Sequence, residues 1–131
     1  MTTATRDDRG VLRVLEASDI DAMPWYPLHD LPGVDQKVLW QSGETVVGLI
    51  RLQPGAVRPP HTHLAAHHHM YVAEGSVRIA GHALTAGAYV HIPPGKEHGM
   101  DDVGPAGCLV FYTHRPVDYS DRHHEFPAAG V

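Results

Sequence analysis

Residues 55–75 read GAVRPPHTHLAAHHHMYVAEG, and residues 87–98 read GAYVHIPPGKEH. Of the 12 histidines in the chain, five lie in the nine positions from His61 to His69. Side chains alternate sides along a strand, so the imidazoles of His61 and His63 are predicted to point the same way. With one histidine from a neighbouring strand and one from a later strand, such as His98, they can converge on a single cation. Neutral imidazole suits Zn, Fe, Cu, Ni or Mn better than Ca or Mg.

The rest of the chain indicates many short strands joined by turns. Its 131 residues include 13 glycines and 11 prolines, and no helical period runs for ten residues. One helical turn is expected near residues 18–21, and Pro24 stops it. Pro94-Gly95 suits a type II turn, and Glu74-Gly75 is expected to separate two strands. The predicted strands are 11–15, 34–41, 45–53, 57–63, 68–73, 76–80, 82–85, 88–92, 97–100 and 108–114. This pattern is typical of an all-β sandwich or barrel of jelly-roll type.

Length and charge limit the class of protein. A chain of 131 residues predicts one domain, and the net charge of -5 argues against nucleic-acid binding. The first nine residues are polar, and no apolar stretch approaches the ~18 residues of a membrane span, so a cytoplasmic protein is expected. We expect a disordered arm over 1–10, a barrel domain over 11–114 and a C-terminal tail over 115–131. The single cysteine, Cys108, lies in an apolar stretch and is expected to be a buried structural thiol.

Both histidine blocks are similar to the paired motifs of the cupin superfamily, G-x5-H-x-H-x(3,4)-E-x6-G and G-x5-P-x-G-x2-H-x3-N. The resemblance spans Gly55 to Asp102 and implies a single-domain cupin-type jelly-roll β-barrel with one divalent transition metal per chain. The chain departs from the motifs twice, because His68 stands at the glutamate position and Asp102 at the asparagine position. The implied metal ligands are His61, His63, His68 and His98.

The third ligand is open to three interpretations. Strand alternation puts His68 on the inward face with Met70 and Val72. His67 lies in the preceding turn and would replace His68 if the gap closes by one residue, and His69 is the remaining alternative.

The other histidines are expected to have ordinary structural roles. His29, His82 and His114 are isolated in the sequence and are predicted to be surface or hydrogen-bonded core residues. His91 alternates with its apolar neighbours and is predicted to face away from them. The pair His123-His124, with Glu125, is expected to belong to a solvated tail. Glu97 is predicted to lie on the surface rather than in the site.

The resemblance also implies a chemistry. A four-histidine site would keep the full +2 charge of a divalent ion, which favours an enolate or carboxylate ligand and acidifies bound water. All-nitrogen sites are similar to those of the small Fe(II) dioxygenases, such as acetylacetone dioxygenase and dihydroxyacetophenone dioxygenase. The resemblance therefore implies a non-haem Fe(II) oxidoreductase that uses O2 to cleave a C–C bond of a small enolisable ketone or diketone. Manganese, nickel, zinc and copper are alternatives to iron.

Two other functions remain open, namely a redox-neutral metal cupin (isomerase, cyclase or lyase) and a non-catalytic cupin that binds a metal or ligand. Oxygen consumption separates the dioxygenase from the redox-neutral enzyme. Single-domain cupins commonly pair through exposed sheet edges, so the resemblance implies a homodimer.

Overall fold

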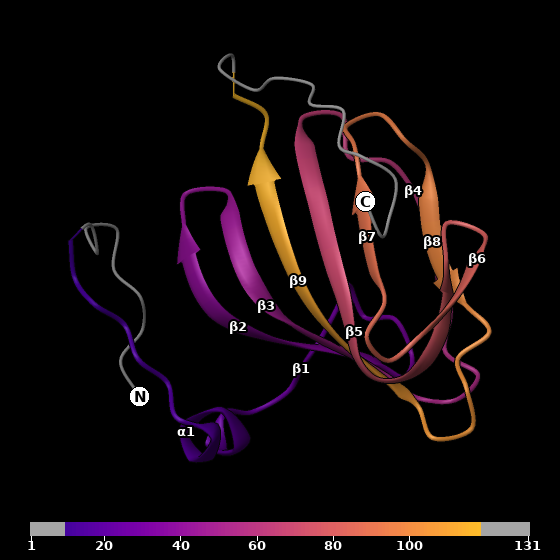
Figure 1. Ribbon diagram of the computed structural model, residues 1–131, viewed down its shortest axis with the longest axis horizontal. Coiled ribbons are helices and arrows are strands. Elements are labelled where there is room, and N and C mark those ends of the chain that lie inside the picture. Colours follow the sequence, from indigo (N-terminus) through magenta and orange to yellow (C-terminus); the bar gives the residue numbers. More distant parts are fainter. Residues whose placement is uncertain (1–9, 119–131) are drawn as a thin grey trace, which may run out of the picture.

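The computed structural model describes residues 10–118. One short helix precedes a set of strands that form a curled antiparallel sheet, drawn in Figure 1. The expected arm lies outside the described residues except for Gly10. His123 and His124 of the expected tail also lie outside them. The elements are α1 (Ala17–Ala22), β1 (Tyr26–Pro27), β2 (Val34–Ser42), β3 (Thr45–Leu52), β4 (Arg58–His61), β5 (Ala66–Ile79), β6 (His82–Thr85), β7 (Tyr89–Ile92), β8 (His98–Asp101) and β9 (Cys108–Pro116).

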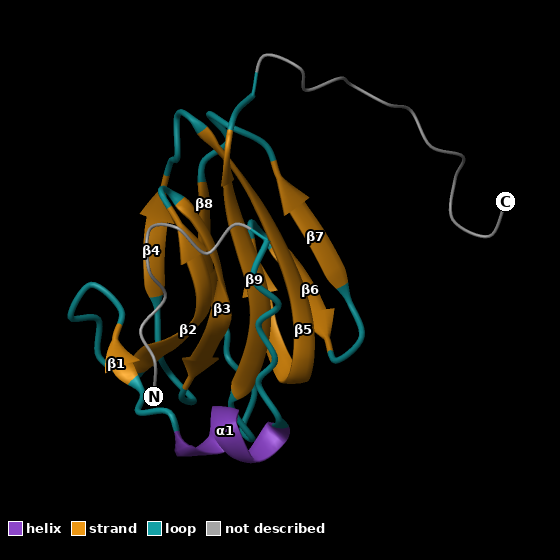
Figure 2. Cartoon of the chain, turned by 90° about the vertical axis from the view of Figure 1, so that its left-hand side faces the viewer, coloured by secondary structure: helices purple, strands orange, loops and turns teal. Residues whose placement is uncertain are grey.

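The sheet follows the order β1-β2-β3-β9-β5-β8-β4, and β6 and β7 also pair with β5. The first half of β5 lies between β7 and β9, whereas its second half pairs with β6 and β8. Strand β5 therefore joins the two walls of the half-barrel, which face each other in Figures 1 and 2. This curled, mostly antiparallel architecture confirms the all-β, cupin-type jelly roll predicted from the sequence.

The prediction of two strands separated by a turn at Glu74-Gly75 is wrong. Residues 66–79 form one continuous strand, with a register shift between Val72 and Glu74 where β5 faces β9. Gly75 has φ 76°, and a Cβ placed there would overlap the carbonyl oxygen of Gly107. A bulge with a left-handed glycine bends a strand without reversing it. The glycine therefore directs β5 from one wall of the half-barrel to the other.

Alternation along β5 sends one set of side chains into the core. Met70 and Val72 are buried among apolar residues of β3, β8 and β9. His68 is buried on the same face with 4% of its surface exposed, as strand parity predicts. Cys108 is a buried free thiol, as expected, and burial raises its pKa to about 11.

The N-terminal part of the described chain differs from the prediction in one segment. Residues 11–15 form no strand, and the apolar side chains of Val11, Leu12 and Val14 are exposed, with Leu12 86% exposed. A strand needs a paired neighbour, and within residues 10–118 no strand pairs with this segment, although Arg13 Nε donates a hydrogen bond to the Leu39 carbonyl. The expected helical turn is present as α1, which ends before Pro24. None of the helices in residues 10–118 is long and apolar enough to cross a membrane.

We expect Gly75→Ala to lower the free energy of unfolding strongly, because the methyl group would meet the Gly107 carbonyl as well as force alanine into a left-handed conformation. Gly81→Ala is the matched control, since Gly81 has φ 81° and a methyl group added there would meet nothing within 4 Å. The control isolates the backbone cost of about 1–2 kcal/mol. Urea unfolding measures the loss of free energy of unfolding in each variant. Equal losses in the two variants would contradict this role of Gly75.

Candidate metal centre

The first two histidines of the site face each other across a strand pair. His61, the last residue of β4, is the register partner of His98, the first residue of β8. Their ring centroids are 4.3 Å apart. The two strands approach closely at Gly99, where a Cβ would lie 2.8 Å from the Arg58 carbonyl oxygen. The glycine after His98 therefore allows the close contact that brings the two rings together.

His63 reaches the same place by a different route from the one predicted. We expected a strand over 57–63, but β4 ends at His61 and His63 lies in the following loop. The Gly95 amide donates a hydrogen bond to the His63 carbonyl at 2.9 Å. Gly95 has φ 82°, and the Lys96 amide bonds the Pro93 carbonyl, as the predicted type II turn requires. The Pro-Pro-Gly turn thus holds the loop that carries His63.

His68 and His114 come from the opposite wall. They are register partners on β5 and β9, and their ring centroids are 4.9 Å apart. The ring of His63 lies 4.4 Å from that of His68 and 5.2 Å from that of His114. His63 therefore links the pair on the β4–β8 wall to the pair on the β5–β9 wall.

Backbone carbonyls orient three of these rings. The Nδ1–H groups of His61, His98 and His114 donate to the carbonyl oxygens of Pro59, Lys96 and Glu44, at 2.9, 3.0 and 3.0 Å. A carbonyl only accepts, so Nδ1 carries the proton and Nε2 keeps its lone pair. This is the arrangement that metal-ligating histidines use, with the second nitrogen fixed by an outer hydrogen bond.

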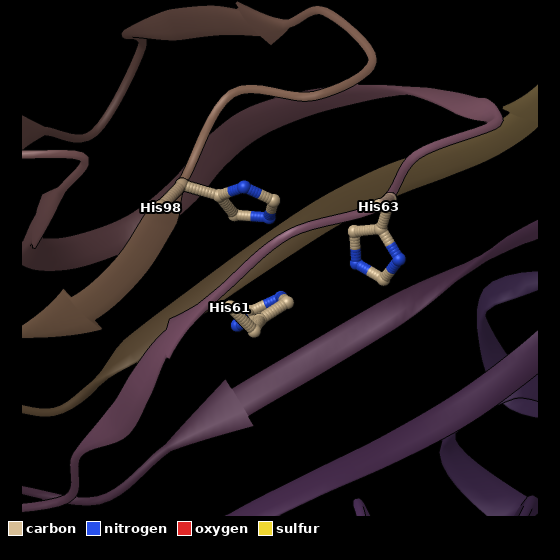
Figure 3. A group of neighbouring side chains, drawn as sticks. All are labelled: His61, His63 and His98. Carbon is tan, nitrogen blue, oxygen red and sulfur yellow. The ribbon is translucent and has the colours of Figure 1, made fainter.

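The nitrogens that face the cluster have no partner within the described protein. Nε2 of His61, His63 and His98 and Nδ1 of His68 are buried without a hydrogen bond. A buried polar atom without a partner is costly, and four such atoms in one cluster would gain a partner from a bound ligand. The ligand nitrogens form two groups within 4.8 Å, His61–His63–His98 and His63–His68–His114. The cluster can therefore hold a metal ion, and Figure 3 shows the first group.

Burial keeps the inner histidines neutral. It lowers the pKa of His68 to about 2 and that of His63 to about 4, with smaller contributions from neighbouring histidines and Arg58. Burial also lowers the pKa of His61 and His98. Neutral imidazole is the form that binds a metal.

The structure thus brings the four predicted ligands to one end of the half-barrel and adds His114, which we expected to be isolated. Its inward position follows from β9 alternation with the buried Val110 and Tyr112, a signal that was present in the sequence. Residue spacing alone does not reveal that β9 lies beside β5. For that reason the sequence did not predict His114 as part of the site.

The two alternatives to His68 lie on the outer face. His67 Nδ1 is 2.8 Å from His91 Nε2, and His69 Nδ1 is 2.7 Å from the Tyr89 hydroxyl. The rings of His69 and His91 are stacked with centroids 4.8 Å apart. Of the other histidines, His82 is exposed as predicted, and His29 is exposed at the mouth of the site. Glu97 is also exposed, as expected.

We expect the metal-free protein to lose stability as the pH falls below 6.5. The unfolded chain takes up protons at histidine near pH 6.5, whereas the folded chain resists protonation of His63 and His68 until about pH 4 and 2. The unfolded state therefore binds more protons in this range, and stability decreases with falling pH. Thermal unfolding with a chelator at pH 7.5 and 5 measures the effect. His68→Gln should reduce the difference between the two melting temperatures, and an unchanged difference would contradict the assignment.

Comparisons with known proteins agree with this architecture. A family model described as the ChrR cupin-like domain matches residues 15–118. No curated protein matches the chain significantly. The polyketide cyclase RemF of Streptomyces resistomycificus is similar in structure, with TM-score 0.67, 19% identity, and coverage of 90% of this chain and 88% of RemF.

Two further solved structures share the fold. An RmlC-like cupin of Shewanella frigidimarina has TM-score 0.62 and 25% identity, covering 76% of this chain and 88% of that one. The anti-sigma factor ChrR of Rhodobacter sphaeroides, solved in complex with SigE, has TM-score 0.61 and 22% identity, with 72% of this chain and 50% of that chain covered. None of these three proteins is described as a dioxygenase. The match over residues 15–118 shows that the chain belongs to the ChrR cupin-like domain family of the cupin superfamily.

Proposed function

We propose that this protein is a mononuclear metal-dependent enzyme that acts on a small enolisable carbonyl compound. One observation carries the proposal, namely that buried ring nitrogens of four histidines have no hydrogen-bond partner among the described residues and belong to two close groups that share His63. An unpaired set of this kind is suited to a transition metal. His61, His63, His98 and His68 would hold the ion, with His114 beside them.

A cavity next to the histidines has room for a small molecule. Its volume is about 290 Å³, and His63, His68 and His114 line one side of it. Apolar side chains of Val46 and Ile50 line another part. Small-molecule sites are typically concave and mostly apolar, with a few polar groups that fix orientation. The cavity therefore favours a compact substrate with a polar end directed at the histidines.

The chain's own groups prepare this site for catalysis. The backbone carbonyls that hold His61, His98 and His114 leave each Nε2 unprotonated and aimed at the cluster. A bound divalent ion would supply Lewis-acid activation of a carbonyl oxygen and, if it is Fe(II), redox chemistry with O2. Where Val46 and Ile50 line the cavity, a bound enolate would lie against apolar groups, and electrostatic interactions are stronger in such surroundings than in water.

The specific form that we favour is the Fe(II) dioxygenase expected from the sequence, because the histidine-rich ligand set resembles that of enzymes cleaving C–C bonds of diketones. Redox-neutral chemistry is the second candidate. The likeness to the RemF cyclase supports it only as an example of catalysis on the same fold. The ChrR likeness supplies the third candidate, a cupin that binds a ligand without turnover.

We expect about one transition-metal ion per chain in anaerobically purified wild-type protein and none in the His61→Ala, His98→Ala double variant. Elemental analysis measures the content, and His82→Ala is the control, because His82 is exposed on β6 and belongs to neither group. The His114→Ala variant shows which of the two histidine groups binds the metal, because His114 belongs only to the group with His63 and His68. Loss of metal in His114→Ala but not in the double variant would show that the ion lies with His63 and His68 instead. No metal in the wild type after reconstitution would refute the enzyme proposal.

We expect the Fe(II)-loaded protein to consume O2 when an enolisable diketone such as acetylacetone is added, because the metal and the anionic substrate would meet in one cavity. An oxygen electrode measures uptake, with the metal-free double variant as the blank. Deuterium exchange at the α-carbon without O2 uptake would favour the redox-neutral enzyme. Neither signal with a panel of diketones and hydroxyketones would favour a binding protein.

A further inference from the structure

Arg58 is a buried cation at the edge of the histidine cluster. It is the first residue of β4, and only 6% of its surface is exposed. Its Nη1 atom is buried and has no hydrogen-bond partner. Arginine remains protonated in proteins, so this side chain brings a full positive charge into the fold. Burial lowers the pKa of Arg58, because the charged guanidinium has lost part of its contact with water.

The described residues provide no counter-ion for this charge. Their ion pairs join Arg51 to Asp35, and Arg78 to Asp101 and Asp102. Arg51 also has a buried nitrogen without a partner, but Asp35 balances its charge. An arginine that only supports a fold is normally paired when it is buried, since an unpaired buried charge is strongly destabilising. Arg58 does not fit a purely structural role.

Arg58 lies where a ligand in the cavity would meet it. It lines the 290 Å³ cavity together with His63, His68 and His114, and it also lines the adjoining cavity beside His61. Its positive charge contributes to lowering the pKa of His61, His63, His68 and His98, so all four rings lie within its electrostatic reach. The residues that line the cavity include no aspartate or glutamate. A water molecule could accept a hydrogen bond from Nη1–H, but it would leave the positive charge uncompensated.

We propose that Arg58 is a substrate-binding residue that pairs with the carboxylate of a small organic acid, while a carbonyl or hydroxyl oxygen of the same molecule is directed at the histidines. This inference rests on the proposed function and narrows its substrate from enolisable carbonyl compounds to those that carry a carboxylate. The planar guanidinium matches a carboxylate with two parallel hydrogen bonds. The apolar walls at Leu28, Val46 and Ile50 favour an organic chain over an inorganic anion.

Two probes of nearly equal shape test the proposal. 2-Oxobutanoate carries a carboxylate, and 2,3-pentanedione replaces that carboxylate with a neutral acetyl group. We expect the wild-type protein to bind 2-oxobutanoate about 10- to 100-fold more tightly, the range typical of a hydrogen bond to a charged group. Binding is measured by calorimetry and by the NMR signal of the Arg58 Nε–H group. Inorganic phosphate is the third probe and distinguishes a carboxylate site from a phosphate site.

Three variants test whether the preference for the carboxylate probe depends on Arg58. Arg58→Met keeps an apolar stem of similar length and should remove the preference, whereas Arg58→Lys should keep part of it. Arg78→Met is the control for loss of one positive charge, because Arg78 is exposed on β5 and pairs with Asp101. Equal wild-type affinity for the two organic probes, or an unchanged preference in Arg58→Met, would overturn the proposal. Tighter binding of phosphate than of 2-oxobutanoate would overturn the carboxylate assignment. If Arg58→Met fails to fold, the wild-type probe comparison and the Arg58 NMR signal still decide.

The same titrations with chelator-treated protein separate this inference from the proposed function. A carboxylate preference that persists without metal supports Arg58 even if the metal-dependent enzyme proposal fails. Metal binding and O2 uptake with neutral diketones, combined with no carboxylate preference, would leave the proposed function standing and refute the role of Arg58.

Discussion

Strand β5 passes from one wall of the half-barrel to the other at a bulge beside Gly75, and the position of the histidine cluster depends on that bend. Before the bulge, β5 pairs with β9 and carries His68 on its inner face. After it, β5 pairs with β8, the strand that begins at His98. Because one strand belongs to both walls, the histidines of the two walls are held at a fixed separation. The close contact of Gly75 with Gly107 leaves no room for a side chain at the bend.

The backbone provides most of the orientation of the ligands. The carbonyl groups of Pro59 in β4, of Lys96 in the loop before β8 and of Glu44 in the β2–β3 turn each accept an Nδ1–H. These carbonyls belong to residues whose side chains do not matter for the bond, so the orientation is a property of the fold. Rings locked in this way lose little entropy when a ligand arrives, and such preorganisation favours tight binding.

The residues that line the cavity carry positive charge and no negative charge. Four histidines line it, namely His29, His63, His68 and His114, and the only formal charge among its lining residues is that of Arg58. A histidine replaces the glutamate of the usual cupin motif at position 68, which removes the one negative charge that the family pattern would place there. Positive charge beside a cavity favours anionic molecules, and the attraction is strongest next to its apolar side chains, where screening by water is weakest.

Much of the fold and part of the candidate site could be predicted from residue order. The H-x-H spacing, the Pro-Pro-Gly turn and the parity of His68 depend on local rules of strand and turn geometry, so they are readable from the sequence. These local rules do not predict which strands far apart in the sequence lie side by side. Tertiary packing alone decided the β5–β9 pairing that brings His114 to His68, the continuous bend at Gly75, and the burial of Arg58 without a counter-ion among residues 10–118. Each of these depends on contacts between residues far apart in the chain.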